Sequence, residues 1–168
     1  IFEWDGSNWI QLGASINGFE ANARSGTSVS LNSSGNQTLS SGDNLNGGEG
    51  SDSLYAEISG TGTYSPTLTS IESIAPTFSG AGTLSLSKAS GITSIEQTNN
   101  SAGSTVSNIG SADGLTLTVA NTGQSATFGF TTAAVAGTSD TVDLILSDVT
   151  AGTITIPSIE TVNITSQD

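Results

Sequence analysis

The chain repeats part of its own sequence without a gap. Residues 51–74, "SDSLYAEISGTGTYSPTLTSIESI", align with residues 139–162, "SDTVDLILSDVTAGTITIPSIETV", at an offset of 88 residues. Both segments open with Ser-Asp and share Ser-Ile-Glu, so an aspartate and a glutamate lie 20 residues apart in each. Five apolar positions also coincide: Leu54 with Val142, Ala56 with Leu144, Ile58 with Leu146, Leu68 with Ile156, and Ile74 with Val162.

A repeat in strict register constrains the fold more than any other feature of this sequence. A further Ser-Ile-Glu at 94–96 and a further Asp-led strand start at Asp113 give spacings of 20 to 27 residues, the size of one β-solenoid coil. We expect the three Ser-Ile-Glu glutamates (Glu72, Glu96 and Glu160) to mark equivalent outward positions. A Greek-key sandwich would also give short strands, but it has no reason to repeat sequence in register.

Short runs of alternating apolar and polar residues fill the chain, such as "LTLTVA" (115–120) and "VDLILS" (142–147). Period two over four to six residues is typical of half-buried strands, and no helical periodicity competes with it. We therefore predict an all-β fold, a parallel β-helix-like β-solenoid. The residues predicted to be mostly buried are Leu54, Ile58, Leu68, Ile71, Val142, Leu144, Leu146, Ile154, Ile156 and Ile159.

The first forty residues differ from the rest. Trp4 and Trp9 flank Asp5-Gly6, a good hairpin turn signal, and a second hairpin signal surrounds residues 32–36. We expect residues 1–40 to form a β-hairpin that caps the solenoid or ends a preceding domain. Residues 41–168 would then form the calcium-binding solenoid domain.

Composition excludes several functions. Fifteen acidic residues against two basic ones give a net charge of −13, which argues against nucleic acid and anionic membranes as partners. The acidity is compatible with divalent cations or a cationic partner, or simply keeps the protein in solution. The chain has no His and no Cys, so a Ser–His pair, a catalytic thiol and a typical zinc site are excluded. No apolar run reaches the roughly 20 residues of a membrane helix, and we expect neither membrane insertion nor enzymatic activity.

Residues 47–55, "GGEGSDSLY", fit the calcium-binding nonapeptide G-G-x-G-x-D-x-U-x, where U is a large apolar residue. Gly47, Gly48 and Gly50 permit strained backbone that turns carbonyl oxygens inward, and Asp52 adds a carboxylate. Calcium takes six to eight oxygen ligands, more than one such turn supplies.

Nine residues earlier, Asp43 stands in the same register as Asp52. The sequence therefore predicts one Ca²⁺ ion held by Asp43 and Asp52, with carbonyl groups of Gly47, Gly48 and Gly50 in its shell. An ordinary Gly/Asp turn remains the alternative. Asp113 and Asp140 also precede strands, where aspartate commonly caps a turn, and they are further candidate ligands.

These residues resemble a known group of proteins. "DNLNGGEGSDSL" (43–54) and residues 137–168 resemble RTX-type, calcium-dependent bacterial S-layer and surface-adhesin proteins, which leave the cell by type I secretion. The resemblance implies a β-solenoid, calcium-driven folding, self-assembly of identical chains at the bacterial cell surface, and no catalysis.

The sequence and this resemblance together predict a structural protein of an extracellular surface assembly, S-layer or matrix-like. The alternative is an adhesin or fibre domain that binds glycan or another cell, which an aromatic-lined groove would favour. A polysaccharide lyase of the parallel β-helix type is a remote alternative, because Arg24 and Lys88 are the only basic residues available to assist carboxylates.

Overall fold

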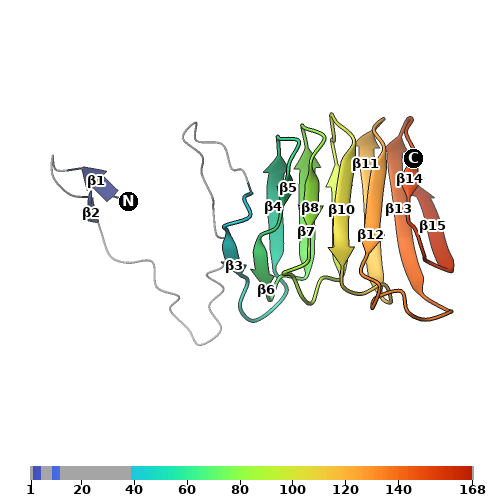
Figure 1. The fold of residues 1–168 in the computed structure, drawn as a ribbon. Coiled ribbons are helices and arrows are strands. Elements are labelled where there is room, and N and C mark those ends of the chain that lie inside the picture. The colour runs from blue at the N-terminus through green and yellow to red at the C-terminus, as the bar shows by residue number, and fades with distance from the viewer. Residues whose placement is uncertain (1, 5–8, 12–38, 168) are drawn as a thin grey trace.

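The computed structural model of the protein describes residues 2–4, 9–11 and 39–167. The described part is all-β, and its parallel strands stack as a solenoid of about six turns, as Figure 1 shows. The predicted fold class is confirmed. None of the described residues belongs to a helix long and apolar enough to span a membrane.

Two parallel sheets form the sides of the solenoid. The six-stranded sheet contains β4 (Ser53–Ile58), β7 (Ser73–Phe78), β9 (Ser94–Thr98), β11 (Leu115–Thr122), β13 (Thr141–Val149) and β15 (Thr161–Gln167). The five-stranded sheet contains β5 (Thr63–Tyr64), β8 (Thr83–Ser85), β10 (Ser104–Ile109), β12 (Ala126–Phe130) and β14 (Ile154–Thr155). A short third side pairs β3 (Asn44–Asn46) with β6 (Thr67–Thr69) and ends in a bridge from Leu68 to Ala89.

Apolar side chains from successive coils stack in columns inside the solenoid. One column of the six-stranded sheet contains Leu54, Ile74, Ile95, Leu117 and Leu144, and it ends at Ile164, which is exposed on the last coil. Of the predicted core residues, Leu54, Ile58, Leu68, Ile71, Val142 and Leu144 are buried. The remaining four, Leu146, Ile154, Ile156 and Ile159, are partly buried and pack against the core. These four belong to the last described coils, where fewer neighbours cover them.

The repeated segments share local geometry. In both, the aspartate main-chain N–H donates to Oε2 of the glutamate 20 residues later, Asp52 to Glu72 and Asp140 to Glu160. The serine before each Ile-Glu has a left-handed backbone, with φ of 51° at Ser70 and 63° at Ser158. The stacking register differs from the sequence alignment by two residues, because Leu54 shares its column with Leu144 rather than Val142. A shift of two residues keeps the same face inward.

The Ser-Ile-Glu at 94–96 does not occupy an equivalent position, so that prediction is wrong for Glu96. Glu96 lies within β9, on the outer face, where it pairs with Thr118. Glu72 and Glu160 instead stand immediately before β7 and β15. The coils differ in length, so an identical triplet falls at a different phase of the turn.

The N-terminal strands pair as predicted. β1 (Phe2–Trp4) and β2 (Trp9–Gln11) are antiparallel, with Trp4 opposite Trp9, and they form a sheet of their own. The hairpin is therefore separate from the parallel ladder. The turn at Asp5-Gly6 and the second hairpin at residues 32–36 lie outside the described residues, and the domain division at residue 40 stays a prediction.

Candidate metal centre

Carboxylates gather along one edge of the solenoid, where the strands of the six-stranded sheet begin. The residues of this acidic edge are Asp52, Glu72, Asp140 and Glu160, which directly precede β4, β7, β13 and β15, and Asp113, which Gly114 separates from β11. Parallel strands all begin at the same edge of their sheet, so residues far apart in sequence form one row.

Asp52 and Glu72 form the first pair on the acidic edge. The main-chain N–H of Asp52 donates to Glu72 Oε2 at 2.8 Å, and the carbonyl of Asp52 accepts the N–H groups of Glu72 at 3.1 Å and Ser73 at 3.0 Å. Oδ2 of Asp52 is buried and has no hydrogen-bond partner among the described residues. A buried carboxylate oxygen without a donor is costly, and a cation or water would remove that cost.

Asp140 and Glu160 form the second pair, and Asp113 joins them. The N–H of Asp140 donates to Glu160 Oε2 at 3.0 Å, and the N–H of Thr141 donates to Asp113 Oδ1 at 3.1 Å. Oδ2 of Asp140 is likewise buried without a hydrogen-bond partner in the described part of the chain. The pair thus reproduces the arrangement at Asp52.

The pKa of the Asp140 carboxyl is raised above its ordinary value. Burial is the main cause, followed by the negative charge of Glu160, a hydrogen bond with its side chain, and the charge of Asp113. A hydrogen bond from the backbone of Gly137 opposes the shift. Like charges and desolvation therefore both disfavour ionised Asp140, which is the electrostatic situation that a bound cation reverses.

Two of the three nonapeptide glycines have the predicted strained backbone, whereas Gly47 is needed because there is no space for a side chain. Gly48 and Gly50 have left-handed φ values of 92° and 111°. Gly47 is buried, donates its N–H to the carbonyl of Thr69 at 3.0 Å, and has no room for a side chain. A Cβ there would collide with the carbonyl oxygen of Ser70 and with Cβ of Asp52. The tight turn at Gly47 therefore places Asp52 beside the next coil.

Asp43 lies at the other end of β3 from Asp52. Its carboxylate accepts the N–H of Ser40 at 2.8 Å and the hydroxyl of Ser40 at 3.0 Å, which is a local turn cap. The three residues of β3 separate Asp43 from the glycine turn, and a strand of that length spans about 10 Å. Asp43 and Asp52 thus have different neighbours, and a shared ion between them stays a prediction.

Sequence reasoning missed Glu72 and Glu160 as site residues. The available signal was the 20-residue spacing from aspartate to glutamate, which equals one coil. Within the described ranges, no three acidic, His or Cys side chains converge closely enough to hold a metal by themselves. An ion at either pair would need main-chain carbonyls or water to complete its shell.

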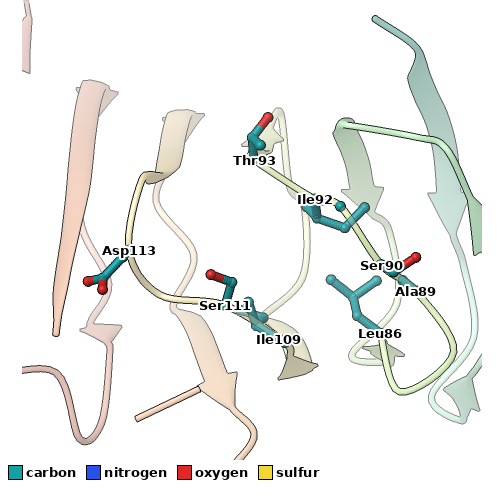
Figure 2. Close-up of a pocket in the computed structure, with 10 residues that line it drawn as sticks. Leu86, Ala89, Ser90, Ile92, Thr93, Ile109, Ser111 and Asp113 are labelled. Atoms are coloured by element: carbon teal, nitrogen blue, oxygen red, sulfur yellow. The ribbon is translucent and has the colours of Figure 1, made fainter. Parts of the chain in front are cut away.

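A separate hollow of about 340 Å³ opens where the third side of the solenoid stops. Leu86, Ile92 and Ile109 line it with apolar groups, and Ser90 and Ser111 add hydroxyls. Figure 2 shows Asp113 at one side of this group, with its carboxylate turned away from the apolar residues. The lining contains no aromatic ring and no basic group, so it lacks the usual platform for a sugar.

Comparisons of the chain with protein-family models, with curated proteins and with solved structures gave no match. Any functional assignment therefore depends on the residues and geometry described above.

Proposed function

We propose that this protein is a structural component of a bacterial extracellular surface assembly, S-layer or matrix-like, and that calcium stabilises its solenoid. The observation that carries the proposal is the pair repeated on the acidic edge. At Asp52–Glu72 and again at Asp140–Glu160, the glutamate carboxylate accepts the main-chain N–H of the aspartate on the adjacent coil, and one buried oxygen of that aspartate has no donor among the described residues.

Calcium suits these pairs because it prefers carboxylate and carbonyl oxygens and tolerates irregular shells. Asp52 and Glu72 would hold one ion, with carbonyl groups of the Gly47–Gly50 turn nearby and Asp43 as the further predicted ligand. Asp140 and Glu160 would hold a second, with main-chain carbonyls or water completing its shell and Asp113 as a further predicted ligand. Each ion would join adjacent coils and cancel their repulsion, so that binding free energy becomes folding free energy.

Assembly at the cell surface agrees with the same features. A net charge of −13 keeps separate chains apart until a cation neutralises them. The nonapeptide at residues 47–55 and the resemblance to secreted RTX-type proteins support an extracellular, non-catalytic role. The adhesin alternative gains little support from the hollow near Ile92, since no aromatic ring lines it.

Thermal unfolding of Asp140→Asn tests the calcium site through a reversal of sign. In excess chelator, removing this charge relieves the repulsion from Glu160 and Asp113, so we expect the Tm of the variant to be higher than that of the wild type. In saturating Ca²⁺ we expect the wild type to have the higher Tm, because the ion stabilises it more than it stabilises the variant.

Glu96→Gln is the matched control, since it removes one charge from the outer face of β9, away from the acidic edge. Its Tm should stay close to the wild-type value relative to the changes in Asp140→Asn, in chelator and in Ca²⁺ alike. If Ca²⁺ does not change the Tm of the wild type, then calcium does not stabilise the solenoid and that part of the proposal is wrong.

Imaging of the purified chain tests the assembly itself. We expect sheets or filaments by electron microscopy in Ca²⁺ and isolated particles in chelator, because neutralised acidic edges no longer repel. Isolated particles under both conditions, at the highest attainable concentration, would contradict a structural assembly role.

A further inference from the structure

Charge is segregated between the two sheets. The strands of the five-stranded sheet contain no Asp, Glu, Lys or Arg, whereas the six-stranded sheet contains Glu57, Glu96, Asp143 and Asp148. The connections that lead into the five-stranded sheet are uncharged too, whereas those that lead out of it contain Glu72, Lys88, Asp113, Asp140 and Glu160. The continuous uncharged runs are residues 59–71, 79–87, 97–112, 119–139 and 149–159. A chain with a net charge of −13 thus carries one neutral side.

Five threonines form an unbroken column on this neutral side. Thr63 pairs with Thr83, Thr83 with Thr105, Thr105 with Thr127, and Thr127 with Thr155. The adjacent residues Leu84, Val106 and Phe128 are fully buried, so the threonines between them point outward. Thr63 and Thr155 are exposed and the other three are half-buried. With neighbouring strands about 4.8 Å apart, the column is about 19 Å long. We call it the threonine face. The strands can be followed by their labels in Figure 1.

Strand propensity alone does not account for this uniformity. Threonine is favoured in strands, but the corresponding central column on the six-stranded sheet is mixed. That column contains Tyr55, Ala75, Glu96, Thr118, Ile145 and Thr165. Both sheets face outward on the same coils, so the uniform column is a property of one side of the molecule.

We infer that the threonine face packs against the threonine face of a second copy of this chain. The inference deepens the proposed self-assembly and rests on it for the identity of the partner. Two chains of charge −13 that met through their acidic edges or six-stranded sheets would bring carboxylates together. At the neutral side no carboxylates of the two chains meet, so the contact itself needs no bridging cation once calcium has neutralised the acidic edges.

The surroundings of the column suit close packing of two sheets. Ser85 and Ser107 pair beside it, and Gly129 lies next to Ser107. Ser85 is buried and accepts a hydrogen bond from the exposed Asn108, so small side chains and one amide flank the column. β-Branched threonines have few χ1 rotamers and lose little freedom when covered. Facing sheets pack about 10 Å apart when their side chains interdigitate.

The contact should be weak in isolation. A column of five residues covers less than the roughly 800 Å² per partner that a standard stable interface buries. In an array, each copy would make several contacts at once, and the effective concentration of neighbours would offset the weakness of each.

Cysteine cross-linking provides the test, because the natural chain has no cysteine. Thr105 is the third of the five threonines, and the central position meets itself whether two copies run parallel or antiparallel. We expect Thr105→Cys to form covalent dimers with a bifunctional thiol-reactive cross-linker that spans about 10 Å, at a several-fold higher yield than Thr118→Cys. Thr118 is the matched control: it is an outward, half-buried threonine on β11 of the other sheet. Unchanged Tm values would verify that both variants fold.

The outcomes separate this inference from the proposed function. Equal yields for the two variants, with calcium-dependent arrays seen by imaging, would overturn the threonine contact and leave the surface-assembly proposal intact. Preferential cross-linking at position 105 without arrays would support the contact and contradict the assembly proposal. Retention on a neutral polysaccharide, abolished by Thr105→Arg and without preferential cross-linking, would assign the face to glycan and overturn the inference.

Discussion

Leu117→Lys is expected to unfold the solenoid. Leu117 is completely buried, and it stacks between Ile95 and Leu144 in the central column of the core. The substitution loses about 1.5–3 kcal/mol of apolar burial. It also places an ammonium group where no carboxylate can pair with it, a penalty of several kcal/mol. Domains are typically stable by about 5–15 kcal/mol, so we expect little or no native protein, measured as loss of the far-UV circular dichroism strand signal and of a cooperative urea transition.

Thr118→Lys is the control for this experiment, since it introduces the same side chain one residue later on the outer face of the same strand. Thr118 pairs with Glu96 on β9 and Ile145 on β13, so the new ammonium would lie near a carboxylate and in water. We expect a change within about 0.5 kcal/mol, as for most surface substitutions. A folded Leu117→Lys variant, or an equal loss of stability in both variants, would show that β11 does not have one buried and one exposed face.

The fold could be predicted because the alternation along each strand and the repeat between coils are both visible in short stretches of sequence. Alternation along Leu115–Thr122 gives a strand with one apolar face, and the gapless repeat implies that such faces recur in the same orientation. The position of a given residue within its coil could not be predicted, because the coils differ in length. Successive residues of the Leu54 column lie 20, 21, 22, 27 and 20 positions apart, so a triplet such as Ser-Ile-Glu falls on the corner in some coils and within the sheet in another.

The candidate site was predicted in part for the same reason. Backbone requirements are local, so the prediction of strained backbone is correct for Gly48 and Gly50, both left-handed, although not for Gly47. Contacts between coils are not local. In coils of about 20 residues, a spacing of nine residues covers roughly half a turn, whereas a spacing of 20 brings side chains one above the other. Asp52 consequently meets Glu72, while Asp43 caps its own turn through Ser40.

Gly47→Ala is expected to disrupt the first carboxylate pair while leaving the second intact. The added Cβ would collide with the carbonyl oxygen of Ser70 and with Cβ of Asp52, and backbone atoms cannot yield as a flexible side chain does. The turn must shift outward, which breaks the hydrogen bond from Gly47 N–H to Thr69 and moves Asp52 away from Glu72. Overpacking of this kind typically costs about 1–3 kcal/mol, measurable by urea denaturation.

Gly62→Ala controls for the general cost of removing a turn glycine, because nothing lies within 4 Å of the Cβ it would add. We expect that variant to unfold like the wild type. Calorimetric titration with Ca²⁺ then links the turn to the site. Gly47→Ala should lose the binding heat of one site and retain that of the Asp140–Glu160 pair, which belongs to a different part of the solenoid. If Gly47→Ala binds as many ions as the wild type and unfolds at the same urea concentration, the glycine turn does not position Asp52 for calcium.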